Sequence, residues 1–232
     1  MGDSNLTLRG HRQSVRDLIY ASLQTAISRG NLAPGQMLSE EQLSSSLNVS
    51  RTPLREALQR LTTEGLIERA DNGRINVKNV SLREATQLYA VRSVLEQLSA
   101  REACLNMTSE GLRRLEGAFG QMLTDEHDPN RDVADSGGSF HEIMHQIADN
   151  PINLRLLQNL QVLLSRYRYL STGRAKRTHG AVEEHERILR ALAAGNADAA
   201  AEAMRIHIAA SFDSVRSALV TLEEMRGQKV SE

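Results

Sequence analysis

Residues 49–66 have the sequence VSRTPLREALQRLTTEGL, which is the most informative segment for the fold. Its apolar residues recur three and four positions apart, which is the spacing of one face of an α-helix. Ser50 or Thr52 can cap the start of this helix, and Pro53 suits its first turn. Gly65 then ends the helix after about residue 64. The face predicted to be buried consists of Leu54, Ala57, Leu58 and Leu61. The residues left on other faces are Arg51, Thr52, Arg55 and Gln59.

Two shorter helices are expected before this one. Apolar residues recur at helical spacing over residues 15–27, and Pro34-Gly35 supplies a turn after them. Ser39-Glu40-Glu41-Gln42 has the form of a capping box, in which the Ser39 hydroxyl accepts from the backbone of Gln42. Asn48 suits the tight turn that follows, because Asn tolerates a left-handed backbone. The pattern predicts a helix-turn-helix.

A hairpin is expected directly after the third helix. Ile67 and Arg69 precede Asp71-Asn72-Gly73, and Ile75 and Val77 follow it. Alternating residues on either side of such a turn are typical of two short antiparallel strands. Residues 11–78 are therefore predicted to form a winged helix-turn-helix.

The sequence after residue 78 predicts helices and no strands. Ser81-Leu82-Arg83-Glu84 is a second capping box, at the end of a linker over residues 79–84. Amphipathic patterns follow at residues 84–106, 109–124, 139–149, 151–171, 181–194 and 197–225. The acid-rich residues 125–130 are expected to form a solvated loop. The fold class is mainly α, with an all-α bundle of six to seven helices over residues 85–226 and tails at 1–10 and 227–232.

Composition narrows the classes of protein without naming a function. The chain has 232 residues, a formal net charge of −1, 3% aromatic residues and one cysteine, Cys104. A single cysteine cannot form an internal disulfide, and no apolar run approaches the ~20 residues of a membrane helix, so we expect a cytoplasmic protein. Residues 11–78 carry nine Lys and Arg against seven acids. This charge is too small to indicate DNA binding, and solvated surface arginines explain the pattern equally well.

A resemblance to a known family decides between these interpretations. Pro34-Gly35-x-x-Leu38-x-Glu40-x-x-Leu43, residues 49–61 and Glu64-Gly65-Leu66 are similar to the GntR family of bacterial regulators. The resemblance implies DNA contacts by the recognition helix and by the tip of the wing, through Ser50, Arg51, Thr52, Arg55 and Gly73. Some family members carry a further DNA-contacting arginine where this chain has Glu41. Asn48 stands where the family usually has Gly.

The second domain resembles the FCD type of effector domain found in one branch of that family. The matching residues are Arg92-x-x-Leu95-Glu96, Phe140-His141, Asn150, Glu184-His185-x-x-Ile188 and Met204-x-x-His207. The resemblance implies a divalent metal, zinc or nickel, held by His141, His185 and His207 and completed by a carboxylate effector. The family's aspartate ligand is replaced by Gly137, and Asp135 lies nearby. Three imidazoles can hold such an ion without it.

Several residues of the second domain allow two interpretations. Arg92 could bind the carboxylate of an effector, or could form an ion pair with Glu96 one turn later. Arg166, Tyr167, Arg168 and Tyr169 could line a cavity or a dimer face. His145 is outside the family pattern, so we expect it to be a bundle or surface histidine.

We therefore expect a homodimer that reads an inverted-repeat operator in double-stranded DNA under control of an organic acid. The alternative enzyme is a zinc peptidase, because His141-Glu142-Ile143-Met144-His145 has the form H-E-x-x-H. That enzyme would need a third protein ligand, and Pro151 stands where the extended motif requires a histidine. A helical scaffold without DNA binding would leave the residues around Arg51 unexplained.

Overall fold

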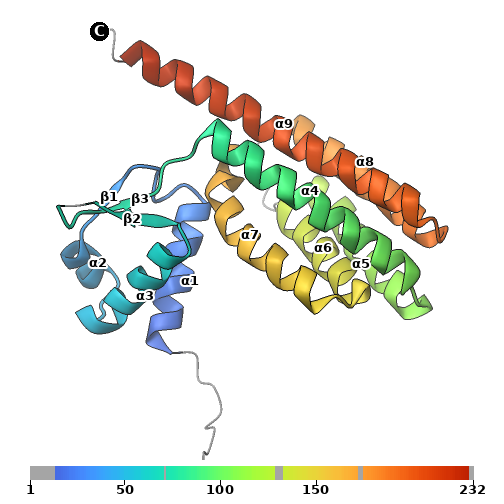
Figure 1. Cartoon of the computed structure of the whole chain (residues 1–232), viewed down its shortest axis with the longest axis horizontal. Helices are drawn as coiled ribbons and strands as arrows, with labels where there is room; N and C mark the ends of the chain where they lie inside the picture. The colour runs from blue at the N-terminus through green and yellow to red at the C-terminus, as the bar shows by residue number, and fades with distance from the viewer. Residues whose placement is uncertain (1–13, 71, 129–132, 172–174, 230–232) are drawn as a thin grey trace, which may run out of the picture. The chain divides into compact units, whose positions relative to one another are not determined.

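The structure of the chain is a computed structural model that describes residues 14–70, 72–128, 133–171 and 175–229. It divides into two compact units, Met1–Asn79 and Val80–Glu232 (Figure 1). The predicted tails fall largely outside the described residues. None of the described helices is both long and apolar enough to span a bilayer.

The first unit has three helices and a small sheet among its described residues. The helices are α1 (Val15–Ser28), α2 (Glu40–Ser46) and α3 (Arg51–Thr63), and the strands are β1 (Met37–Leu38), β2 (Ile67–Arg69) and β3 (Ile75–Val77). The strands are antiparallel in the order β1-β3-β2. The hairpin was predicted, but β1 was not, because two residues are too short to show strand alternation.

Local chemistry explains where these elements start and stop. The Ser39 hydroxyl accepts from the backbone of Gln42, as the capping-box pattern predicts. Asn48 has a φ of 50°, which is the left-handed backbone expected between α2 and α3. Ser50 is the N-cap residue of α3 but makes no side-chain cap hydrogen bond.

The core of the first unit lies between α1, α3 and the sheet. All four predicted residues of the α3 face are buried, and the helix packs on α1 through Ile19, Leu23 and Ile27. Leu66, Ile67, Ile75 and Val77 close the core from the hairpin. The apolar burial that stabilises this unit also fixes which face of α3 remains exposed.

The second unit is a bundle of helices throughout its described residues. They are α4 (Leu82–Leu105), α5 (Ser109–Glu126), α6 (Val133–Ala148), α7 (Pro151–Ser171), α8 (Ala175–Ala193) and α9 (Ala197–Lys229). Helix α4 packs against α6, α7 and α9, α5 packs against α6 and α8, and α8 packs against α9. Phe140, Met144, Ile188 and Met204 are fully buried between them.

Several sequence-based boundaries differ in this unit, and α8 begins at Ala175 rather than residue 181. The linker is shorter than predicted because α4 already begins at Leu82, where the Ser81 hydroxyl caps the backbone of Glu84. Helix α5 continues into the predicted loop, and Asp125 is buried there. Helix α6 begins at Val133 rather than residue 139. Its early turns include Gly137 and Gly138, whose low helix propensity concealed them.

Candidate functional site

The N-terminal end of α3 exposes the residues predicted to contact DNA. Ser50, Arg51, Thr52 and Arg55 are all exposed. Gly73 is exposed at the turn between β2 and β3, with a φ of 78° and open space where a Cβ would lie. A recognition helix enters the major groove N-terminal residues first, so these positions suit contacts with bases and phosphates.

Glu40 connects α3 with the hairpin in the same unit. Its Oε2 accepts from Nε of Arg55 at 2.8 Å, and its Oε1 lies 3.6 Å from a terminal nitrogen of Arg69. The other terminal nitrogen of Arg69 donates to the carbonyl of Gly73 at 3.3 Å. The hydrogen bond from Arg55 lowers the pKa of Glu40 despite partial burial, and Arg69 lowers it further.

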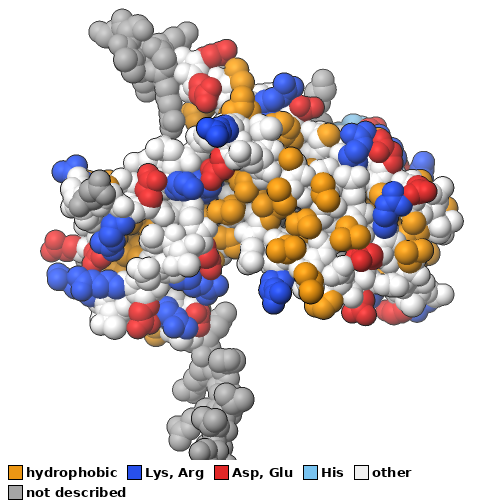
Figure 2. All heavy atoms as spheres, in the orientation of Figure 1, with side chains coloured by type: hydrophobic (Ala, Val, Ile, Leu, Met, Phe, Trp, Pro, Cys, Tyr) orange, Lys and Arg blue, Asp and Glu red, His pale blue; other side chains and the backbone are white. Residues whose placement is uncertain are grey.

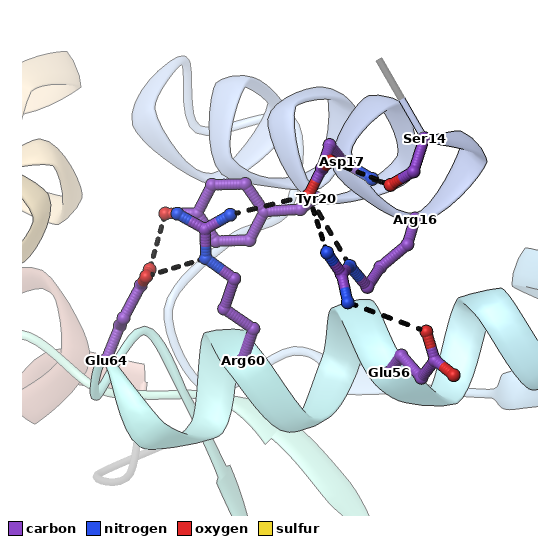
Figure 3. Close-up of polar contacts among 7 residues, drawn as sticks. All are labelled: Ser14, Arg16, Asp17, Tyr20, Glu56, Arg60 and Glu64. Carbon is purple, nitrogen blue, oxygen red and sulfur yellow. Dashed lines mark hydrogen bonds and ion pairs between the residues drawn. The ribbon is translucent and has the colours of Figure 1, made fainter. Parts of the chain in front are cut away.

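A separate polar network fixes α3 on α1 (Figure 3). The Tyr20 hydroxyl bonds to Glu64, and Nε of Arg60 donates to the same carboxylate at 2.9 Å. The guanidinium of Arg60 also stacks 3.7 Å from the centre of the Tyr20 ring. Burial and the hydrogen bond to Glu64 raise the pKa of Tyr20 to about 12. These contacts give Arg60 a role in holding the helix pair together.

In the second unit, the three predicted metal ligands converge inside the bundle. His141 comes from α6, His185 from α8 and His207 from α9, and all three are buried. The Nε2 atoms of His141 and His207 lie 3.2 Å apart, and each of the three imidazoles offers a nitrogen within 4.8 Å of the others. Residues separated by 66 positions in the sequence thus form one cluster.

Each of these imidazoles has an acceptor on its opposite nitrogen, Nδ1. His141 faces Oε2 of Glu96 at 3.1 Å, and His207 faces Oε2 of Glu184 at 2.8 Å. His185 faces the carbonyl of Ala181 at 2.7 Å. Acceptors at these positions place the proton on Nδ1 and leave the lone pair of Nε2 directed into the cluster.

This arrangement fits a divalent cation. Two lone pairs facing each other repel unless a proton or a metal ion lies between them. Two nitrogen ligands bound tetrahedrally to zinc at 2.0–2.1 Å would be about 3.3 Å apart, close to the 3.2 Å between His141 and His207. Histidine ligands of metals usually donate their other N–H to a carboxylate or a carbonyl, as all three do here.

Gly137 lies beside the cluster and offers it no ligand atom. Since α6 begins before it, Gly137 lies one turn ahead of His141 on the same face. An ideal Cβ on Gly137 would lie 3.5 Å from Nε2 of His185 and 3.6 Å from Cε of Met122, both ordinary contacts. The side chain of Asp135 lies outside the described residues.

Glu96 contacts two further residues besides His141. Its Oε2 also lies 2.9 Å from Nε2 of His145, and its Oε1 accepts from Nε of Arg92 at 3.2 Å. Burial alone would raise the pKa of Glu96, but His141, His145 and Arg92 together hold it well below its usual value. The ion pair of Arg92 with Glu96 is the one that their spacing predicts.

The peptidase interpretation fails at its general base. His141 and His145 of the motif form a second group of possible metal ligands with Glu96, whose ligand atoms lie within 4.8 Å of one another, but His145 is not part of the cluster of three imidazoles. Glu142 is exposed whereas His141 is buried, because neighbouring residues of a helix point about 100° apart. The required general base is therefore absent from the cluster.

The cluster of Arg and Tyr on α7 is partly internal. Arg166 and Tyr167 are buried, and both contact Oε2 of Glu84, at 2.9 and 2.7 Å. They tie α7 to the first turn of α4. The side chains of Arg168 and Tyr169 lie outside the described residues.

Sequence reasoning missed the roles of Glu96 and Glu184 beside the imidazoles. Both glutamates belong to the motifs quoted for the second domain, and Glu184 directly precedes His185. A buried carboxylate usually signals a charged or hydrogen-bonded partner. The sequence does not reveal that these two are buried, so burial was the missing signal.

Two family descriptions match the chain. "Bacterial regulatory proteins, gntR family" matches residues 16–77, and "FCD domain" matches residues 87–210. The first match lies within the unit with the hairpin, and the second lies within the bundle that holds the histidine cluster.

Known proteins resemble the chain over most of its length. It is 30% identical over 205 residues to the HTH-type transcriptional repressor RspR of Escherichia coli (strain K12), covering 88% of this chain and 90% of RspR. It is 31% identical over 209 residues to the HTH-type transcriptional regulator LutR of Bacillus subtilis (strain 168), covering 78% and 92%. The solved structure of E. coli McbR/YncC matches with a TM-score of 0.77 at 20% identity, covering 88% and 98%. That structural match shows a shared fold.

Proposed function

Since the chain belongs to the gntR family of bacterial regulatory proteins and carries an FCD domain, we propose how this DNA-binding transcriptional regulator is controlled. A small organic acid binds in the helical unit and changes the affinity of the winged helix-turn-helix for its operator. The observation that carries this proposal is the buried cluster of His141, His185 and His207, whose Nδ1 atoms are all engaged.

The proposed cofactor is a zinc or nickel ion held by the Nε2 atoms of these three histidines. When bound, it supplies a Lewis-acid centre with open positions that accept carboxylate oxygens. Glu96 and Glu184 hold two of the imidazoles in the required tautomer, and their negative charge favours a cation beside them. Because Gly137 provides no carboxylate, the effector itself is the remaining source of negative charge on that side.

Arg92 is the proposed second contact for the effector. Its ion pair with Glu96 engages Nε, and its side chain is only 16% exposed. A guanidinium in this position can bind an anion through its terminal nitrogens while it stays paired at Nε.

The proposed DNA site is an inverted repeat read by a homodimer. Ser50, Arg51, Thr52 and Arg55 enter the major groove, and the wing tip at Gly73 approaches the minor groove. Each copy of the dimer binds one half-site, so the two-fold symmetry of the protein matches that of the inverted repeat. A cytoplasmic location follows from this function.

An exposed apolar face on the second unit supports the homodimer. Hydrophobic side chains gather over α4 and α7 in Figure 2. The exposed large hydrophobic residues of these two helices include Val91, Val94, Leu98, Ile152 and Leu156. Their exposed fractions run from 40% at Leu98 to 65% at Val94. Neighbouring exposed apolar residues on packed helices are typical of protein interfaces, and a second copy offers an identical surface.

The experiment that tests the function has two stages. First, the purified protein selects binding sequences from a random double-stranded library, and binding to the selected fragment is measured against salt. Second, small carboxylic acids are screened by thermal shift, since a ligand that binds only the folded state raises its stability. Any acid that stabilises the protein is then added to the DNA-binding assay.

We expect a selected, salt-sensitive sequence and an acid that changes its Kd. The His185→Ala variant should retain DNA binding and lose the response to the acid. If the protein selects no sequence, DNA-directed regulation as proposed is wrong. If it selects a sequence but no carboxylic acid changes binding, the effector proposal alone fails.

A further inference from the structure

We propose that Glu40 and Arg69 form a brace that fixes the recognition helix relative to the wing and so determines operator selectivity. The brace consists of Arg55, Glu40, Arg69 and the carbonyl of Gly73. Neither Glu40 nor Arg69 is expected to read bases. The inference rests on the proposed function, because it assigns positioning residues to the same DNA-reading surface.

The contacts run continuously across the first unit. Arg55 on α3 bonds to one oxygen of Glu40, and Arg69 on β2 faces the other oxygen. Arg69 also donates to the wing tip through the carbonyl of Gly73. One carboxylate at the start of α2 therefore joins the helix expected in the major groove to the turn expected at the minor groove.

The two arginines are engaged differently. Glu40 takes Nε of Arg55, so the terminal nitrogens of that guanidinium are not used by this contact. Arg69 uses one terminal nitrogen for Glu40 and the other for Gly73. Arg55 is thus oriented with its bidentate edge still available, whereas Arg69 is committed to the protein.

The negative charge of Glu40 shows that its role is to position other residues and not to attract DNA. Glu40 places a negative charge beside DNA phosphates, so its carboxylate weakens non-specific binding rather than supporting it. Its side chain is 24% exposed, and those of Arg55 and Arg69 are 63% and 49% exposed. Ion pairs this exposed contribute little to folding. Glu40 thus opposes DNA binding and adds little to folding stability. Its role in the proposal is to orient Arg55 and the wing.

The test compares Glu40→Gln with Glu56→Gln. Both variants lose one negative charge from the first unit, but Glu56 is outside the brace and lies 3.9 Å from Arg16 instead. The probes are the DNA fragment that wild type selects from a random library and a shuffled fragment of equal length. The measured quantity is the ratio of the two Kd values at fixed salt.

We expect Glu40→Gln to reduce this selectivity ratio by about 10-fold, the scale of one lost bidentate base contact. Binding to the shuffled fragment should stay equal or become tighter, since two arginines are released toward phosphates. Glu56→Gln should tighten binding to both fragments and leave the ratio unchanged.

A second pair of variants tests the part of the brace that lies in the wing. Arg69→Gln and Arg74→Gln each remove one positive charge from the hairpin, and only the first should reduce selectivity. The brace is overturned if Glu40→Gln and Arg69→Gln keep the wild-type ratio, or if their controls lose as much. If wild type itself selects no sequence, the proposed function fails together with the brace.

Discussion

Nε2 of His141 and Nε2 of His207 lie 3.2 Å apart, although their Nδ1 atoms bond to two different carboxylates. Two neutral imidazoles protonated on Nδ1 would face each other through lone pairs at this distance. A cation relieves this repulsion, and the cost of its burial is offset by Glu96 and Glu184. This relationship supports the proposed metal site, which the following experiment tests.

Chelation should therefore lower the thermal stability of the wild-type protein. A ligand present at about 100 times its Kd stabilises the folded state by roughly 2.7 kcal/mol. We expect EDTA to lower the Tm of wild type by several degrees and to leave His207→Ala unchanged. His179→Ala is the control, because His179 is exposed and contacts Glu126 instead. Equal responses of the two variants would rule the cluster out as the metal site.

Substitution of Gly137 should change the balance between metal and effector. Gly137→Asp adds a carboxylate beside Nε2 of His185, whereas Gly138→Asp adds one at an exposed position. We expect the first variant to retain metal more tightly in competition with a chromophoric chelator. It should also bind carboxylic acids more weakly, because its own oxygen occupies their place. Identical metal retention by both variants would contradict this role for position 137.

Loss of Arg51 should weaken operator binding with a change in base preference. A bidentate contact with guanine is worth about 1–3 kcal/mol, so Arg51→Ala should raise the operator Kd by roughly 5- to 150-fold. Arg29→Ala removes an exposed arginine at the end of α1 and should change Kd little. Binding to a set of single-base operator variants distinguishes the two possible roles. An equal loss on every sequence would identify a phosphate contact.

The apolar face on α4 and α7 should hold the dimer. Val94→Glu places a charge at its most exposed valine and should shift the protein toward monomer in sedimentation velocity. Val220→Glu is the matched control on α9, at a valine that is 41% exposed. Truncation of interface anchors typically costs more than 1 kcal/mol, so the dimer Kd should rise at least ~5-fold. A Val94→Glu protein that stays dimeric would place the interface elsewhere.

Alkaline pH should destabilise the first unit through Tyr20. Its pKa is raised from 10.0 to about 12 by burial and by Glu64. Because the folded-state pKa is the higher one, this stabilisation is complete below pH 10 and is lost as pH rises toward 12. Chemical denaturation of wild type and Tyr20→Phe should show a difference in free energy of unfolding that shrinks over this window. A constant difference would mean that Tyr20 ionises equally in both states.

Local sequence patterns were enough to predict the order of the two units and the exposed face of α3. Helical spacing separated Leu54, Ala57, Leu58 and Leu61 from Arg51 and Arg55, and burial in the structure follows that division. Caps and turns were also predictable, because Ser39, Asn48 and Ser81 act through neighbours two to five residues away. The family motifs identified His141, His185 and His207. In the structure these three histidines lie together in one cluster.

The sequence did not predict which distant side chains contact each other. Glu96 and Glu184 support His141 and His207 across different helices, and Glu40 meets Arg55 and Arg69 from three separate elements. These contacts depend on packing between elements, so their residues show no spacing in the sequence. Strand β1 and the early start of α6 likewise show no clear pattern in the sequence. Local patterns fix elements and faces, whereas the chemistry of the cluster and of the brace arises from how those faces pack.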